Sequence, residues 1–195
     1  MTEATRRMPA DAPGLGSVRR VLGLALLCLL LPAAGAGQQT PANDPFDRVS
    51  FLIGRWQGTS EGQPGKGTVG REYTRALNGR FIRVRNRSEY PAQEKNPKGE
   101  VHEDEGFISF DRARRKLVLR QFHVEGFVNH YVEDADSTAT RLVFTTESIE
   151  NIPPGWRARE TYVVHGPDAF EEIFELAEAG RPFEVYSRAR LTRER

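Results

Sequence analysis

Two glutamates in the C-terminal half of the chain stand among apolar residues. Glu160 is two residues from Tyr162, and Glu172 lies midway between Phe170 and Phe174. Residues two apart in a strand face the same side, so both carboxylates share a predicted core face with aromatic side chains. A buried carboxylate is destabilising unless a charged group pairs with it. The pattern therefore indicates either an ion pair or a ligand-binding site.

Three residues of another predicted strand, Arg120, Gln121 and His123, are the candidate partners of these carboxylates. An internal salt bridge would fix the register of the strands. A polar anchor at the bottom of an apolar pocket would instead orient an amphipathic molecule. Both interpretations remain open. The residues that we predict to bind the ligand are Glu160, Glu172, Arg120, His123, Tyr162, Phe144 and Phe174.

The sequence offers no nucleophile elbow and no metal-site spacing. The match to Gly-x-Ser-x-Gly at 58–62 lies in a predicted strand and opens no helix, the one Cys is Cys28, and no two His stand four residues apart. His102 precedes Asp104 in a run of charged residues that we interpret as a solvated loop edge. His123 and His130 flank a turn and are predicted to face one another across a hairpin. We accordingly expect no catalytic residue and no metal ligand.

Charge and composition limit the classes of function. The chain holds 28 Lys and Arg against 27 Asp and Glu, a formal net charge of +1, which argues against nucleic-acid binding. Hydrophobic residues make up 38% of the chain, as is typical of a globular protein. A globular domain that binds a small molecule is therefore favoured over a nucleic-acid-binding or disordered chain.

The N-terminal segment has the pattern of a secretory signal peptide. Arg19 and Arg20 precede the apolar run 21–32, and Ala34 and Ala36 form an Ala-x-Ala cleavage site. The run is shorter than the ~20 residues that span a bilayer, and an uncleaved anchor is the alternative. We expect a signal peptide over 1–36, a linker over 37–42 and one domain over 43–195. The product would be periplasmic or secreted, without a stable membrane span after cleavage.

The domain is predicted to be all-β after one short helix. Asn43 or Asp44 caps a helix that ends near Ile53, and after Gly54 the apolar residues recur with a period of two. Turn signals divide the remainder into ten strands, near 55–61, 68–77, 80–90, 105–110, 116–125, 127–133, 140–149, 156–165, 169–177 and 182–192. Ten sequential antiparallel strands favour a closed up-and-down barrel, with an open sandwich as the alternative.

The segment 52–58, LIGRWQG, is similar to the Gly-x-Trp signature of calycins, which include lipocalins, fatty-acid-binding proteins and nitrobindins. Over roughly residues 46–193 the chain most resembles a family of secreted bacterial calycin-like barrels. That family is a domain of unknown function, related to nitrobindin-like haem-binding barrels. The resemblance implies that Trp56 closes one barrel end beneath an arginine of the last strand, either Arg190 or Arg193.

The resemblance to nitrobindins also implies haem, which those barrels hold through one His on the last strand. This chain departs from that pattern, because residues 182–192 contain no His and Ser60 replaces a glycine of the nitrobindin start. Tyr186 offers a phenolate as an alternative iron ligand. We therefore expect a cofactor-free, non-catalytic carrier or sensor of a small amphipathic molecule. The alternatives are a haem-binding barrel with isomerase or peroxide-type chemistry, and a structural barrel whose core is filled.

Overall fold

The computed structural model describes residues 44–195 of the chain. The predicted signal peptide over 1–36 and linker over 37–42 lie outside the described residues. Between residues 44 and 195, none of the helical segments has the length and apolar character needed to cross a bilayer.

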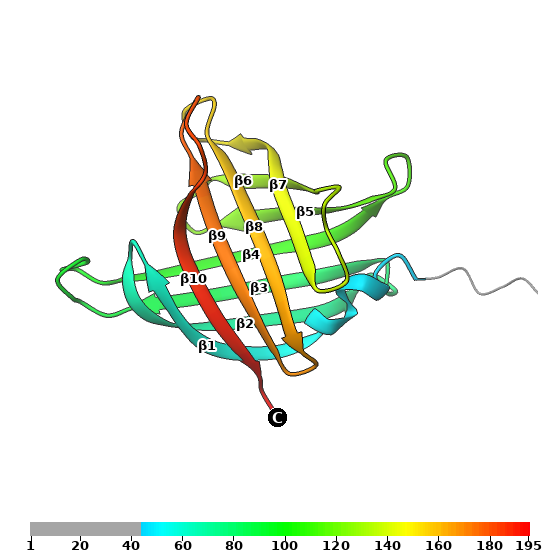
Figure 1. Cartoon of the computed structure of the whole chain (residues 1–195), viewed down its shortest axis with the longest axis horizontal. Helices are drawn as coiled ribbons and strands as arrows, with labels where there is room; N and C mark the ends of the chain where they lie inside the picture. The colour runs from blue at the N-terminus through cyan, green and yellow to red at the C-terminus, as the bar shows by residue number, and fades with distance from the viewer. Residues whose placement is uncertain (1–43) are drawn as a thin grey trace, which may run out of the picture. The chain divides into compact units, whose positions relative to one another are not determined.

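Ten antiparallel strands follow one short 3-10 helix and close into a barrel (Figure 1). The elements are η1 (Asp47–Leu52), β1 (Gly54–Gly62), β2 (Gly65–Ala76), β3 (Phe81–Tyr90), β4 (Glu100–Asp111), β5 (Lys116–His123), β6 (Val128–Glu133), β7 (Arg141–Glu150), β8 (Arg157–Gly166), β9 (Ala169–Ala177) and β10 (Glu184–Arg193). Each strand pairs with its sequence neighbours, and β1 pairs with β10 from Trp56↔Arg193 to Gly62↔Ser187. This closing ladder confirms the predicted up-and-down barrel and excludes the open sandwich.

Alternation along each strand decides which side chains fill the barrel. In β3, Ile82, Val84 and Asn86 are buried, whereas the intervening Arg85 and Arg87 are exposed. The same period of two is seen in β1 and β6, whereas β5, β7 and β8 each bury three consecutive residues. A bulge between Val185 and Ser187 interrupts the pattern in β10, and it leaves Val185 40% exposed.

Two predicted elements differ from the structure. The N-terminal helix is a six-residue 3-10 segment, and Asp44 accepts the Phe46 backbone N–H at 2.9 Å just before it. Strand β4 begins at Glu100, so His102 lies in a strand and not in the charged loop that the sequence suggested. The strand continues the β3 ladder, in which His102 pairs with Ser88.

Helix η1 and Trp56 close one end of the barrel, which we call the closed end. The Trp56 indole donates to the Leu52 carbonyl at 2.7 Å, and the Arg193 guanidinium lies 4.1 Å from the indole ring centroid. Arg193 also donates to the carbonyls of Phe51 and Ile53 at 2.8 and 2.7 Å. The structure thus places Arg193 over the tryptophan.

Arg190, the other arginine that the resemblance offered for this contact, lies on the outer face of β10. Its guanidinium is mostly exposed and is 3.9 Å from carboxylates of Glu61 and Glu171.

Gly54 explains why the closing contact needs the Gly-x-Trp motif. Its φ is +129°, and a Cβ there would lie 2.6 Å from an Arg193 nitrogen. A side chain at Gly54 would be strained and would displace the guanidinium.

Candidate functional site

A cavity of about 470 Å³ occupies the opposite end of the barrel, which we call the open end. Its volume lies within the range of small-molecule sites. Apolar side chains of several strands and loops form its wall, namely Phe127, Ile149, Ile152, Pro153, Trp156, Phe174, Leu176 and Tyr186. Charged and amide side chains face the same space, namely Arg71, Asn86, Glu100, His102, Asp104, His123, Glu125, Asn129, Glu160 and Glu172.

An ion pair crosses the barrel at the floor of this cavity. Arg71 of β2 donates to Glu172 of β9 through two bonds, Nη2 to Oε1 at 2.7 Å and Nε to Oε2 at 3.0 Å. Both side chains are about nine-tenths buried. Burial alone lowers the pKa of Arg71, but the Glu172 carboxylate outweighs it and raises that pKa above its usual value. The Arg71 guanidinium is therefore charged, and the pair joins β2 to β9 across the interior behind β1 and β10.

Glu160 of β8 is the second carboxylate at this floor, and it has a different character. It is 8% exposed, and its Oε2 has no hydrogen-bond partner among the described residues. Burial raises the pKa of Glu160 well above its ordinary value, the nearby Glu172 charge adds to the shift, and Arg71 opposes it. A single guanidinium thus pairs with one of the two carboxylates, and burial favours the neutral form of Glu160.

The structure separates the predicted ligand-binding residues into three groups. Glu160, Glu172, His123 and Phe174 line the cavity. Phe144 and Tyr162 are fully buried in the core towards the closed end, where their rings pack edge to face at 6.3 Å. Arg120 is exposed on the outer face of β5, so Arg71 and not Arg120 is the partner of Glu172.

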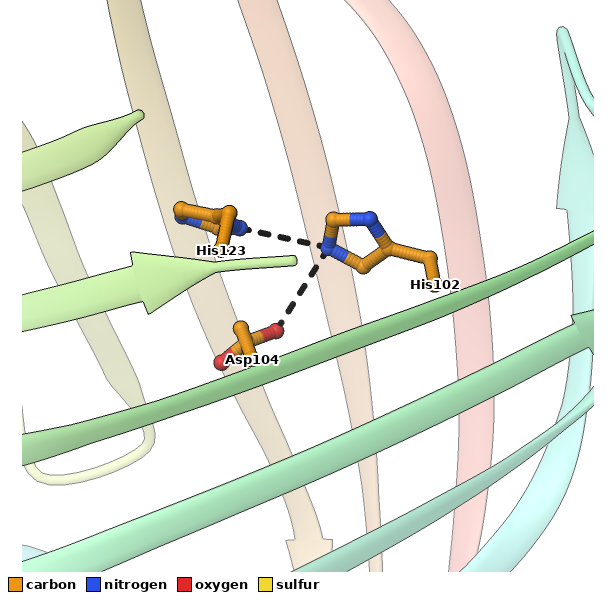
Figure 2. Close-up of side chains that lie close together, drawn as sticks. All are labelled: His102, Asp104 and His123. Atoms are coloured by element: carbon orange, nitrogen blue, oxygen red, sulfur yellow. Dashed lines mark hydrogen bonds and ion pairs between the residues drawn. The ribbon is translucent and has the colours of Figure 1, made fainter. Parts of the chain in front are cut away.

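Three polar side chains meet at one side of the cavity, and we call them the His–Asp–His cluster: His102 and Asp104 of β4 and His123 of β5 (Figure 2). His102 Nε2 is 3.2 Å from His123 Nδ1 and 3.7 Å from Asp104 Oδ2. Burial lowers the pKa of His123 to about 4, so this imidazole is neutral. Burial also disfavours the charged form of His102, but Asp104 and Glu125 outweigh it and raise its pKa to about 8.

Each member of the cluster is held by a further side chain. His102 Nδ1 is 2.8 Å from Glu125 Oε1. Asp104 Oδ1 accepts hydrogen bonds from the amides of Asn86 and Gln121, at 2.9 and 3.0 Å.

His123 stacks on Phe127 with ring centroids 4.0 Å apart, and its Nε2 is 3.1 Å from the Asn129 amide nitrogen. These contacts, with those described above, hold each side chain of the cluster in one orientation.

The remaining histidines are not part of this arrangement. His130 is on the outer face of β6 and is 2.6 Å from Glu150, so it does not face His123 as predicted. His165 is exposed near the end of β8. Sequence reasoning overlooked the pairing of His102 with His123. The signal was the spacing of His102 and Asp104, which places both on one face of a strand.

Tyr186 brings a phenol to the cavity from the last strand. It lies at the β10 bulge, half-buried, with its ring 5.7 Å from that of Phe174 in an edge-to-face contact. Burial raises the pKa of its hydroxyl. Ser187 also faces the cavity, and β10 contributes no imidazole to it.

Comparisons with known proteins agree with this architecture. Residues 46–193 match the sequence model of a family described as "THAP4-like, heme-binding beta-barrel domain". The crystal structure of Rv2717c from M. tuberculosis is similar in fold, with a TM-score of 0.60 at 19% identity over 77% of this chain and 98% of that chain. A de novo designed fluorescence-activating β-barrel aligns with a TM-score of 0.39 at 13% identity, over 76% of this chain and 98% of that one. No curated protein matches the chain in sequence.

Proposed function

Because the chain belongs to the family of THAP4-like, heme-binding β-barrel domains, we propose that its open-end cavity binds a small, partly apolar molecule. One observation carries this proposal: the closed end is filled by side chains, whereas the open end keeps about 470 Å³ with an apolar wall and a charged floor. A site of this kind orients an amphipathic ligand. Its apolar part lies against Trp156 and Phe174, and its polar group reaches Glu160 and the Arg71–Glu172 pair.

Haem is the ligand that the family indicates, and the cavity meets its chemical requirements. The wall is aromatic and aliphatic, and Tyr186 supplies a phenol oxygen from the last strand, where nitrobindins carry a His. Among the described residues no hydrogen bond involves the Tyr186 hydroxyl, so the oxygen is available to a metal. Bound haem would supply an iron centre whose reactivity depends on its axial ligand. Tyr186 would hold the iron, and the wall would exclude water from the porphyrin faces.

Two titrations of the purified protein test the proposal: haemin, followed by its Soret band, and a fluorescent fatty acid. Phe174→Arg introduces a charge into the cavity wall and is expected to weaken both at least tenfold. Phe122→Arg makes the same change on the outer face of β5, where Phe122 is 55% exposed, and should leave both unchanged. Tyr186→Phe should weaken haemin binding and leave the fatty acid unaffected.

Absence of saturable binding with either probe would overturn the proposal. So would equal binding by the wild type and Phe174→Arg. Saturable binding of the fatty acid alone, with no change in the haemin spectrum, would retain the carrier function and reject haem. In that case the protein is the non-catalytic carrier or sensor that its sequence predicts.

Export is a separate proposal that rests on the N-terminal sequence alone. The pair Arg19 and Arg20, the apolar run 21–32 and the Ala-x-Ala site support cleavage after Ala36 and a periplasmic or secreted product. N-terminal sequencing of the protein from its host tests this, with Gly37 expected as the first residue. An intact N-terminus in the membrane fraction would contradict it.

A further inference from the structure

We propose that the His–Asp–His cluster is a binding site for a divalent transition-metal ion, held by His102, Asp104 and His123 at the side of the cavity. Two imidazoles and one carboxylate form the donor set of many zinc and iron(II) sites. The three donors of the cluster do not include Tyr186, which the haem proposal uses, although all four side chains line the same cavity. The proposal does not depend on the function proposed above.

The spacing of the three donors fits a metal ion. Donor atoms that each lie about 2.1 Å from a tetrahedral metal ion are about 3.4 Å from one another. The two separations from His102 Nε2 are 3.2 Å to His123 Nδ1 and 3.7 Å to Asp104 Oδ2. All three donor atoms lie within 4.8 Å of one another. Two of the three separations are thus close to the tetrahedral value, and the third, between Asp104 and His123, is at most 4.8 Å, so that rotation of the Asp104 carboxylate or the His123 ring would bring the donors together.

The outer contacts are those of a metal site. His102 presents Nε2 to the cluster while its Nδ1 contacts Glu125, the carboxylate–histidine arrangement that orients a metal-binding imidazole. Asn86 and Gln121 both donate to Oδ1 of Asp104, which leaves Oδ2 for the ion. Three side chains thus support two donors, more than a solvated surface cluster requires.

Asn129 provides an observation independent of this spacing. Among the described residues its buried Oδ1 has no hydrogen-bond partner, although its Nδ2 is 3.1 Å from both His123 Nε2 and the Tyr131 hydroxyl. If the amide is turned over, Oδ1 accepts the proton of His123 Nε2 and can also accept the Tyr131 hydroxyl, while Nδ2 takes the position without a partner. The lone pair of His123 Nδ1 then points into the cluster, where it can bind a metal.

Charge around the cavity also favours a cation. Glu172 is paired with Arg71, and burial favours the neutral form of Glu160. Of the acidic side chains that line the cavity, this leaves Glu100, Asp104 and Glu125 without a guanidinium among the described residues. Since the three donors come from one side, a bound ion would keep at least one coordination position open to the cavity.

Metal titration of the chelator-treated protein tests this inference. We expect one Co²⁺ per chain with the visible bands of four- or five-coordinate cobalt, and displacement of these bands by Zn²⁺. His123→Ala and Asp104→Asn should each weaken binding at least a hundredfold. Glu125→Gln, which removes only the outer contact of His102, should weaken it by about ten- to a hundredfold. His130→Ala is the matched control, because His130 also contacts a glutamate but lies on the outer face, and it should bind Co²⁺ as the wild type does.

Two results would overturn the inference: no stoichiometric Co²⁺ binding by the wild type, or binding that His123→Ala leaves unchanged. Thermal melts establish that each variant is folded, and His102→Gln replaces His123→Ala if the latter is not. The Tyr186→Phe variant separates the two proposals, since it should lose haemin binding and retain Co²⁺. Failure of haem binding would leave the cobalt result unaffected.

Discussion

The two ends of this barrel are built from the same strands with opposite kinds of side chain. At the closed end, Leu52, Trp56 and Phe170 are almost completely buried, and the Trp56 and Phe170 rings meet edge to face at 4.7 Å. At the open end, amides and carboxylates of the same strands face a cavity. The change occurs within single strands, as in β9, where Phe170 is followed two residues later by Glu172.

Buried polar atoms without a hydrogen-bond partner give one consequence of the difference between the closed and open ends. Seven buried side-chain polar atoms among the described residues have no hydrogen-bond partner, and three of them, Asn86 Oδ1, Asn129 Oδ1 and Glu160 Oε2, belong to side chains that line the cavity. Each such atom destabilises the fold, so a fold selected for stability alone would replace it. The three that line the cavity are polar groups that a ligand or an ion can satisfy, and we expect the closed end to contribute more stability than the open end.

Replacing a tryptophan at each end of the barrel should give the largest difference in the free energy of unfolding. Trp56→Ala should lower the free energy of unfolding by about 3–5 kcal/mol, because it leaves a large void beneath η1 and removes the ring under Arg193. Trp156→Ala should cost less than about 1 kcal/mol, since Trp156 is half-buried beside an existing cavity. Denaturant unfolding measures both. Equal losses for the two variants would remove the proposed division of roles.

The ion pair at the boundary between the ends should be the next most sensitive position. Glu172→Gln leaves Arg71 charged and buried with a neutral partner, and we expect a loss of about 3 kcal/mol. Glu175→Gln is the matched control in the same strand, because Glu175 pairs with Arg159 near the surface and should cost less than about 1 kcal/mol. A loss for Glu172→Gln no larger than that of the control would show that the pair adds no stability.

Glu160 should give the smallest effect, with the opposite sign. Its folded-state pKa is raised above the ordinary value of 4.5, so the folded form binds the proton more tightly than the unfolded form does. The contribution of Glu160 to the free energy of unfolding is therefore fully present below pH 4.5, and it is lost as the pH rises through the folded-state pKa. Glu160→Gln should therefore gain on the order of 1 kcal/mol over the wild type at pH 7.

The measurement for Glu160 is the difference in unfolding free energy between Glu160→Gln and the wild type, followed from pH 4 to pH 8. Taking the difference removes the contribution of groups that titrate in both proteins. We expect the difference to grow with pH. A difference that is constant, or that shrinks as the pH rises, would mean that Glu160 is ionised in the folded protein.

Much of this architecture could be predicted from the sequence, because a closed barrel repeats one simple signal. The period of two identified all ten strands, and it placed Glu160 and Glu172 on the inner face. The same signal would have identified Arg71, which lies between Val69 and Tyr73, two buried residues of β2, but Arg71 was not among the predicted partners of the carboxylates. Arg120 was predicted as a partner instead, and Arg120 faces solvent.

The His–Asp–His cluster could not be predicted from the sequence, for a different reason. The segment from Glu100 to Glu105 is polar at nearly every position, so alternation of apolar and polar residues gives no sign that it is a strand. Only the ladder to β3 and β5 shows that His102 and Asp104 point inward, and only that ladder brings Asp104 opposite His123. A polar interior leaves no hydrophobic period from which its strands can be recognised.

The closing contact between Arg193 and the carbonyl of Ile53 joins residues that are 140 positions apart. Every other ladder of the barrel links strands that follow one another in the chain, so each can form as a local hairpin. Pairing β1 with β10 has by far the largest loop-closure cost in entropy, because it closes a loop that contains all the other strands. We therefore expect this ladder to form last in folding. Until then both edge strands expose unpaired backbone groups, so the nascent chain is open to aggregation until β10, Glu184–Arg193, has been synthesised.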